Sequence, residues 1–264
     1  MKVSYRIKIR SRHPSHSVLR KNLPKLGFTS IVRLGSTTEL LDKSKVELNS
    51  IESIRTSSNK LLMKEAFTKH NVKTADWFKL IDINKEELPF EYPIVIKNIY
   101  GSRNTGNHFI SNREELDSFL SKSINLNNYI VEKYYNYNKE YRLHVNKHTC
   151  FYTCRKMLKT DAKNRWFRND SNSIWVLEEN ELFDRPANWN EIVNECIKAL
   201  NAVGLDFGAI DLRVQSNKDK KENIRQNPDF IVIETNSAPS FGNITQQKYL
   251  EEIPKMLINK YNNR

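Results

Sequence analysis

Cysteine is scarce in this chain, with three among 264 residues. So few cysteines cannot form a disulfide scaffold, and they favour a reducing, cytoplasmic compartment. Long apolar runs are missing too, since no stretch approaches the ~20 residues that a membrane span requires. The N-terminal stretch MKVSYRIKIRSRH also lacks the continuous apolar segment of a secretory signal peptide. We therefore expect a cytoplasmic protein without a membrane partner.

Acidic residues are fewer than basic residues in this chain. The 31 Asp and Glu residues face 43 Lys and Arg residues, which gives a formal net charge of +12. A positive surface attracts polyanions, meaning nucleotide phosphates, nucleic acid or an acidic protein. Part of the excess lies early in the chain, at Arg6, Lys8, Arg10, Arg12, Arg20, Lys21 and Lys25. This basic segment predicts either recruitment of an acidic or phosphate-bearing macromolecule, or simply a solvated surface.

Strand-like and helix-like patterns alternate along the chain without an internal repeat. Period-two or buried-strand patterns occupy residues 2–10, 90–96 and 129–134, and a hairpin is expected over 141–157. Helix patterns begin near Asn59 and cover 112–120, 189–203 and 245–261. This mixture predicts an α+β, or mixed α/β, fold class.

Two apolar segments near the C-terminus carry polar residues where a buried strand should have none. Asp211 interrupts GLDFGAIDLRV, and Glu234 and Asn236 end the apolar run of DFIVIETNSAP. Glu234 and Asn236 share a face because side chains two apart in a strand point the same way. If the two strands pair, three oxygen-bearing side chains converge, and such oxygens suit Mg²⁺, which also keeps phosphates as ligands. The alternative is a hairpin with acidic residues at its mouth.

A second polar set suits phosphate groups. Lys60 opens a helix, Lys97 follows the apolar run PIVI, and the loop GSRNTG occupies residues 101–106. Small and polar residues let backbone N–H groups close over phosphate oxygens, while a lysine supplies a point charge. The loop is neither a Walker A sequence nor G-x-G-x-x-G, so those nucleotide folds are not indicated. The alternative for this loop is a plain turn.

Five phrases, in order, resemble the ATP-grasp superfamily and, within it, the ribosomal-protein glutamate-ligase group. They are NKLLMKEAFTKHNV, PIVIKNIYGSRNTG, YIVEKYYNYNKEYRLHV, FGAIDLRV and IVIETNSAP, spread over residues 57–241. The resemblance implies an ATP-grasp fold with two lobes and a shortened N-terminal α/β segment. The implied segments are 1–56, a small lobe at 57–127 and a large lobe at 128–264. ATP would lie between the lobes together with Mg²⁺, for which Mn²⁺ can substitute.

The resemblance also implies roles for individual residues. The cofactor-binding set would be two nucleotide lysines, a phosphate lid, an adenine hinge and a ribose acceptor: Lys60 and Lys97; Gly101, Ser102 and Gly106; Glu132 with the backbone of Lys133 and Tyr134; and Glu140. The magnesium ligands would be Asp211, Glu234 and Asn236. The candidate anion clamps, which would act in catalysis, are Arg142, Arg155, Arg168 and Arg213.

In this family Mg-ATP phosphorylates a carboxylate, and an amine then attacks the acyl phosphate to give an amide. The implied function is an ADP-forming, ATP-dependent carboxylate–amine ligase. The shortened first segment would leave an open cleft, which would suit a macromolecular acceptor such as an acidic protein or a nucleic acid. Two alternatives remain: a phosphotransferase that stops at phosphate transfer, and a non-catalytic, basic nucleic-acid-binding protein. The sequence specifies neither the carboxylate nor the amine, nor the oligomeric state.

Four potential zinc ligands occur within eleven residues, at His144, His148, Cys150 and Cys154. Their spacings do not match the common finger or ribbon patterns, and a turn near 146–147 would separate His144 from the others. We therefore expect packed hairpin residues rather than a zinc site.

Two further groups have alternative interpretations. Trp166 and Phe167, beside several basic residues, can stack on a nucleobase, but we expect packing in a core or lid. His13 and His16 flank a proline, and we expect both to be solvated.

Overall fold

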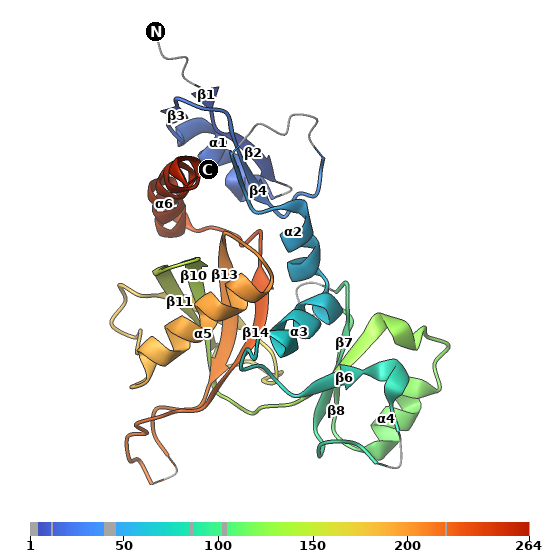
Figure 1. Ribbon diagram of the computed structural model, residues 1–264. Coiled ribbons are helices and arrows are strands. Elements are labelled where there is room, and N and C mark those ends of the chain that lie inside the picture. The colour runs from blue at the N-terminus through green and yellow to red at the C-terminus, as the bar shows by residue number, and fades with distance from the viewer. Residues whose placement is uncertain are drawn as a thin grey trace.

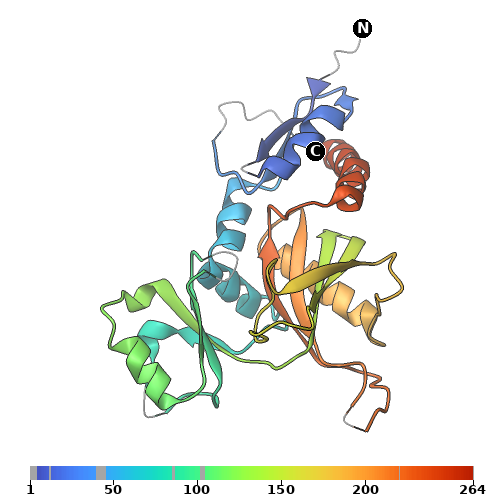
Figure 2. The ribbon, with the colours of Figure 1, turned by 180° about the vertical axis from the view of Figure 1, so that it is seen from behind.

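The computed structural model describes residues 5–11, 13–39, 46–84, 87–101, 105–219 and 221–263. Within these residues the strands form four sheets, and the chain has the predicted mixed α/β character. The two larger sheets lie side by side, and the N-terminal elements sit at one end together with the C-terminus (Figures 1 and 2). Among the described helices, none combines the length and apolar character needed to cross a membrane.

The N-terminal segment contains a three-stranded parallel sheet in the order β2-β4-β5 and a small antiparallel pair, β1 with β3. The expected single strand over 2–10 is wrong, because the chain leaves one sheet and enters another at Ile7. Residues 1–4 lie outside the described ranges. The elements are β1 (Tyr5–Arg6), β2 (Lys8–Ser11), η1 (Pro14–His16), α1 (Ser17–Asn22), β3 (Lys25–Leu26), β4 (Ser30–Leu34) and β5 (Val46–Leu48).

The C-terminal helix α6 (Asn243–Asn262) completes the core of this N-terminal sheet. Its residues Tyr249, Ile253 and Leu257 are fully buried at four-residue spacing, which places them on one face of the helix. That face packs in the same cluster as Ile9 and Val32 of the parallel sheet. The two ends of the chain therefore fold together, although the proposed division at residue 56 assigns them to different segments.

The middle of the chain forms a four-stranded antiparallel sheet in the order β6-β9-β7-β8. Strand β9 belongs to this sheet, whereas the proposed boundary at 127/128 would place it in the large lobe. A boundary within residues 134–138 would keep every strand with its own sheet. The elements are α2 (Ile51–Ser58), α3 (Lys60–Lys69), β6 (Trp77–Lys79), η2 (Leu80–Asp82), β7 (Ile94–Asn98), β8 (Asn107–Ile110), α4 (Arg113–Leu120), η3 (Leu126–Asn128) and β9 (Tyr129–Lys133).

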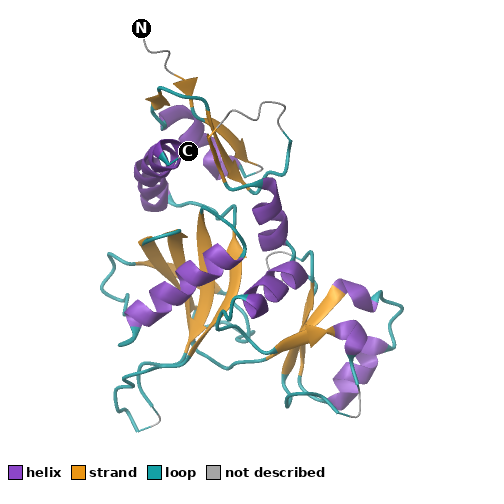
Figure 3. Ribbon diagram, in the orientation of Figure 1, coloured by secondary structure: helices purple, strands orange, loops and turns teal. Residues whose placement is uncertain are grey.

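The largest sheet has five antiparallel strands in the order β12-β11-β10-β13-β14. Helix α5 (Trp189–Ala202) covers one face, where Leu143, Ile210 and Leu212 pack against it (Figure 3). Because neighbours in a strand point to opposite faces, Arg142 and Asp211 project to the other side. The strands are β10 (Lys139–Asn146), β11 (Cys150–Leu158), β12 (Ser173–Leu177), β13 (Phe207–Val214) and β14 (Phe230–Asn236). This second face carries six of the predicted site residues: Glu140, Arg142, Asp211, Arg213, Glu234 and Asn236.

Candidate functional site

Asp211, Glu234 and Asn236 come together on the face of the large sheet that helix α5 leaves uncovered. Strands β13 and β14 pair so that Asp211 lies directly opposite Glu234, and Ala209 lies opposite Asn236. The Asn236 amide donates hydrogen bonds from Nδ2 to Asp211 Oδ2 at 3.2 Å and to Glu234 Oε1 at 3.3 Å. The hairpin therefore gathers two carboxylates and an amide at one point.

Arg142 forms a bidentate ion pair with Asp211. Its Nε donates to Oδ1 at 2.6 Å and its Nη2 to Oδ2 at 2.7 Å, and the two residues are neighbours across strands β10 and β13. Burial alone would raise the pKa of Asp211, but the Arg142 guanidinium outweighs burial and holds that pKa below its ordinary value. The Asp211 carboxylate thus stays ionised, as a cation ligand must be.

The donor set of this cluster fits a hard divalent cation. Glu234 is half-buried and, within the described ranges, forms no ion pair. An amide side chain can present its oxygen as well as its NH₂ group, so Asn236 can also serve a cation. All three donors are then oxygens, which Mg²⁺ prefers over the nitrogen and sulfur ligands typical of zinc. The residues present are therefore compatible with magnesium.

The four potential zinc ligands are not gathered into a site. His144 is buried, its Nδ1 lies 2.9 Å from the Tyr249 hydroxyl, and burial lowers its pKa to about 3. His148 is exposed, and all three cysteines are free. In the described part of the chain, no three His, Cys, Asp or Glu side chains are grouped to hold a metal ion. The expectation of packed hairpin residues is consistent with this arrangement.

The two predicted nucleotide lysines meet where helix α3 abuts strand β7. Asn59 ends helix α2 and caps α3, with its side-chain oxygen accepting from Leu61 N at 2.9 Å. The backbone N–H of Lys60 donates to Ile99 O at 2.9 Å, which ties the start of α3 to the chain just after β7. Burial lowers the pKa of Lys60, and nearby Glu234 opposes that shift. Lys60 therefore lies close enough to Lys97 of the small sheet and to Glu234 of the large sheet for both charges to act on it.

Lys97 is held by a buried carboxylate. Its Nζ donates to Glu132 Oε2 at 2.6 Å. The other oxygen of the same carboxylate, Oε1, lies 3.2 Å from Lys64 Nζ. Burial lowers the pKa of Lys64 to about 8, since Glu132 only partly offsets it. Burial alone would raise the pKa of Glu132, but the two lysines lower it to about 2. Sequence reasoning missed Lys64, although it lies one helical turn after Lys60 and so shares its side of α3.

The predicted adenine hinge is used differently in this structure. Both oxygens of Glu132 are engaged by lysines, so the carboxylate is not presented to a base. The Lys133 N–H donates to Asp76 O at 2.9 Å and the Tyr134 N–H to Pro93 O at 3.3 Å. In this structure these groups build the small sheet and anchor Lys97, and the adenine-hinge role stays a prediction.

Glu140, the predicted ribose acceptor, lies at the centre of three cations on the same face as Asp211. Arg213 Nε is 3.3 Å and Arg168 Nη1 is 3.5 Å from Oε2, while Lys156 Nζ is 3.8 Å from Oε1. Burial lowers the pKa of Arg168, with Glu140 opposing the shift. Two of the predicted anion clamps, Arg168 and Arg213, are thus brought together with Glu140.

Arg155 is not part of this group. It pairs across β10 with Tyr141, whose side chain packs on the face covered by α5, and its guanidinium forms an ion pair with Asp184. Its neighbour Lys156 points to the polar face instead, because the side-chain period of a strand is two. In this structure Arg155 is paired with Asp184, and its role as an anion clamp stays a prediction.

The predicted phosphate lid is only partly described, because Ser102 lies outside the described ranges. At its base, Asn98 N donates to Gly106 O at 3.0 Å and Gly101 N donates to Asn98 O at 3.1 Å. A Cβ on Gly101 would lie 2.2 Å from Thr105 O, and Gly106 has φ +74°, so both positions require glycine. The two glycines close the base of the loop.

Trp166 connects the two sheets next to this site. Its ring stacks on Phe109 of β8 with centroids 5.4 Å apart, and its backbone oxygen accepts from Arg213 Nη2 at 2.6 Å. The tryptophan ring therefore packs against the small sheet while its backbone contacts the large sheet, in line with the expected packing role. His16, in contrast to expectation, is fully buried, with Nε2 2.8 Å from Pro239 O.

The Lys64–Glu132–Lys97 group predicts how the free energy of unfolding depends on pH. A carboxyl group whose pKa is lowered by folding stabilises the protein above its ordinary pKa and loses that contribution as the pH falls towards the folded value. We expect Glu132 to contribute about 3 kcal/mol that disappears between about pH 4.5 and pH 2. Urea unfolding of the wild type and of Glu132→Gln/Lys64→Met across this range measures the difference. Equal pH slopes for both proteins would contradict it.

Comparisons with known proteins show which sequences and folds this chain is similar to. No protein-family model matches the chain. A D-alanine–D-alanine ligase of Lacticaseibacillus casei is 26% identical over 162 residues, which are 58% of this chain and 43% of that relative, and the counterpart from Lacticaseibacillus paracasei matches equally. The matched part thus spans less than half the length of these curated relatives.

Solved structures resemble the chain over a larger share of its length. The D-alanine–D-alanine ligase of Bacillus anthracis has a TM-score of 0.63 at 15% identity and covers 97% of both chains. The carboxyaminoimidazole ribonucleotide synthase of Aspergillus clavatus, in complex with ATP, has a TM-score of 0.56 at 16% identity over 84% of this chain and 56% of that one. The narrower likeness to the ribosomal-protein glutamate-ligase group stays a prediction. Both kinds of enzyme are ATP-grasp proteins, and this chain has the ATP-grasp fold.

Proposed function

We propose that this protein is an ATP-dependent carboxylate–amine ligase that forms an amide through an acyl phosphate and releases ADP. The observation that carries the proposal is the convergence of Asp211, Glu234 and Asn236 on the face shared with Glu140 and its three cations. Lys60, near Glu234, links this face to Lys97 of the small lobe. Solved relatives of the same fold include complexes with ATP and ADP, which supports ATP as the nucleotide.

Different sets of residues have different roles in such a reaction. Lys60 and Lys97 bind phosphate oxygens of ATP, while Asp211, Glu234 and Asn236 hold Mg²⁺. When bound, the metal neutralises charge on the phosphates and orients them. Arginines near Asp211 and Glu140, namely Arg142, Arg168 and Arg213, stabilise negative charge on the transferring group. Such fixed charges act where charge develops, so the mechanism needs no covalent enzyme nucleophile.

The reaction has two chemical steps. A carboxylate oxygen of the substrate attacks the γ-phosphorus, and the bond from that phosphorus to the β,γ-bridging oxygen breaks, releasing ADP. The amine nitrogen then attacks the acyl carbon, the bond to the phosphate oxygen breaks, and inorganic phosphate leaves as the amine loses a proton. A phosphotransferase would stop after the first step, and a purely nucleic-acid-binding protein would need none of these buried charges.

The acceptor is proposed to be a macromolecule with acidic or phosphate groups. Six basic residues of the N-terminal segment are exposed: Arg6, Lys8, Arg10, Arg20, Lys21 and Lys25. Within the described ranges none of them forms an ion pair, and Arg12 lies outside those ranges. Unpaired surface cations attract polyanions with an affinity that falls as salt rises.

The products identify the reaction. We expect ADP and inorganic phosphate, not AMP and pyrophosphate, because the acyl phosphate forms by transfer of the γ-phosphoryl group. Incubation with Mg-ATP, candidate carboxylates and hydroxylamine is expected to give a hydroxamate, measured by mass spectrometry with nucleotide analysis in parallel. AMP among the products would overturn the mechanism. A stable phosphorylated acceptor that resists hydroxylamine would favour the phosphotransferase.

A further inference from the structure

Lys64 is a buried lysine without a role in the proposed reaction. Its side chain is fully buried, on helix α3 one turn after Lys60. Lys64 Nζ lies 3.2 Å from Glu132 Oε1, while Lys97 Nζ donates to Glu132 Oε2 at 2.6 Å. One buried carboxylate is therefore shared by two lysines, and one of them is a predicted nucleotide lysine.

The Lys64–Glu132–Lys97 group has one positive charge in excess. Burial lowers the pKa of Lys64 only to about 8, so this lysine is still mostly protonated at neutral pH, and Glu132 is ionised. Two lysines therefore face one carboxylate. Without Lys64, the Glu132 carboxylate would neutralise Lys97, and the remaining pair would attract a phosphate only weakly. With Lys64 present, the group keeps a net positive charge at the end of β7, where Lys97 lies.

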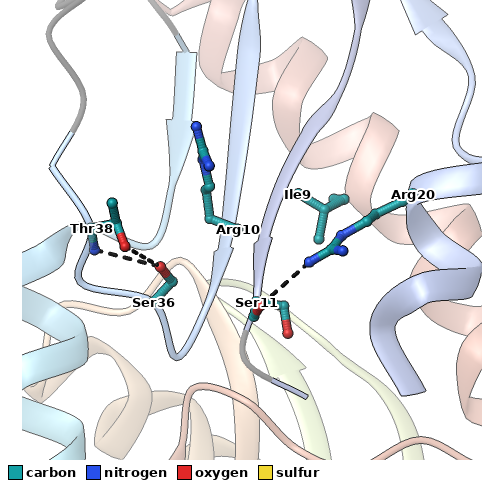
Figure 4. Close-up of a pocket in the computed structure, with 6 residues that line it drawn as sticks. All are labelled: Ile9, Arg10, Ser11, Arg20, Ser36 and Thr38. Atoms are coloured by element: carbon teal, nitrogen blue, oxygen red, sulfur yellow. Dashed lines mark hydrogen bonds between the residues drawn. The ribbon is translucent and has the colours of Figure 1, made fainter. Parts of the chain in front are cut away.

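Burial makes the Lys64 charge act more strongly than a surface charge. The Lys64 side chain is 0% exposed, and those of Glu132 and Lys97 are 7% and 12% exposed. Water and salt screen exposed charges, whereas buried pairs are screened much less. Arg10 and Arg20 illustrate the exposed case, because both lie at the surface beside a pocket of the N-terminal segment (Figure 4). A surface lysine could therefore not reproduce the effect of Lys64 on Lys97.

Contacts with the large sheet fix Lys64 in place. Its Nζ also donates to Thr74 Oγ1, and the Thr74 hydroxyl donates to Val232 O of strand β14 at 2.7 Å. The preceding residue of the helix, Met63, accepts through its sulfur from Thr235 N of the same strand at 3.4 Å. Strand β14 carries two of the predicted metal ligands. Lys64 is therefore held from the large sheet while it holds a carboxylate of the small sheet.

We propose that Lys64 is a positioning residue for ATP: it binds Glu132 from the far side, so that Lys97 keeps a positive charge for the nucleotide phosphates. The inference rests on the proposed function, in which Lys97 binds phosphate oxygens of ATP. Lys64 acts through Glu132 and not by contact with the nucleotide, because its buried ammonium donates to Glu132 and Thr74. Helix α3 thus supplies one predicted nucleotide lysine, Lys60, and one residue that supports the other.

Calorimetric titration of the full-length chain with Mg-ATP tests this role. Lys64→Met is expected to weaken binding about tenfold, because the remaining Lys97–Glu132 pair carries no net charge. Adding Glu132→Gln to Lys64→Met restores the net charge of the group. The affinity of this double variant is expected to return to within about threefold of the wild type. Lys69→Met, at the exposed end of the same helix, is the matched control and should bind ATP like the wild type.

Recovery by the second substitution distinguishes a charge effect from a structural one. If Lys64 only stabilised the fold, the folded Lys64→Met variant would bind ATP with wild-type affinity, and that result would overturn the proposal. Failure of Glu132→Gln to restore binding would overturn it as well. Circular dichroism checks folding of each variant. Lys64→Gln, which keeps a hydrogen-bond donor without the charge, replaces Lys64→Met if that variant is unfolded.

Failure of the ligase proposal would look different. The wild type would then give no hydroxamate, while ATP affinity still followed the net charge of the Lys64–Glu132–Lys97 group. A wild type that does not bind Mg-ATP would overturn this inference together with the nucleotide site.

Discussion

Glu234→Gln is expected to lower ATP-dependent ligation by about 10²–10³-fold while leaving the protein folded. Glu234 faces Asp211 across the hairpin and, unlike Asp211, forms no ion pair within the described residues, so the substitution removes a ligand charge without breaking a structural pair. Steady-state ADP release measures the loss in kcat. Urea unfolding of the same variant is expected to give a free energy close to that of the wild type.

Asp211→Asn is expected to differ from Glu234→Gln, because it should reduce stability as well as activity. Asp211 is buried and holds Arg142, so removing its charge leaves an unpaired arginine and is expected to destabilise the fold by about 3–5 kcal/mol as well as to abolish turnover. Glu181→Gln, at an exposed position, is the matched surface control and should retain wild-type activity. Full ADP release by Glu234→Gln would refute the metal-site assignment.

Lys97→Met is expected to weaken ATP binding by about 10- to 100-fold. A charge-assisted hydrogen bond contributes about 1.5–3 kcal/mol, and Lys97 is positioned at the end of β7 by Glu132 at 2.6 Å. Lys64 still neutralises Glu132 in this variant, so the small sheet should remain folded. Calorimetric titration with Mg-ATP measures the affinity.

The control for this variant is Lys79→Met. Lys79 lies in the same sheet but is paired with Glu65 on the exposed surface, so its loss should change ATP affinity little. An unchanged dissociation constant in Lys97→Met would remove Lys97 from the nucleotide site. A comparable loss in both lysine variants would instead point to an effect of overall charge.

Local sequence patterns were enough to predict the central residues of the site. Asp211 and Glu234 were recognisable because they sit within apolar runs, and Glu234 and Asn236 share a face by the two-residue period of a strand. The start of α3 at Lys60 followed from the capping residue Asn59, which is a local signal as well. In these two cases the deciding signal lies within one strand or one helical turn, so the sequence alone was sufficient.

The tertiary structure decided what depended on partners far apart in the chain. Arg155 and Lys156 are adjacent, yet strand pairing sends one to Asp184 and the other to Glu140. The role of Glu132 could not be predicted either, because it depends on lysines from a helix and from another strand meeting around one buried carboxylate. A strand's period fixes which residues share a face but not which face is buried, nor which distant charges meet there. For the same reason, only the folded chain shows that the C-terminal helix completes the core of the N-terminal sheet.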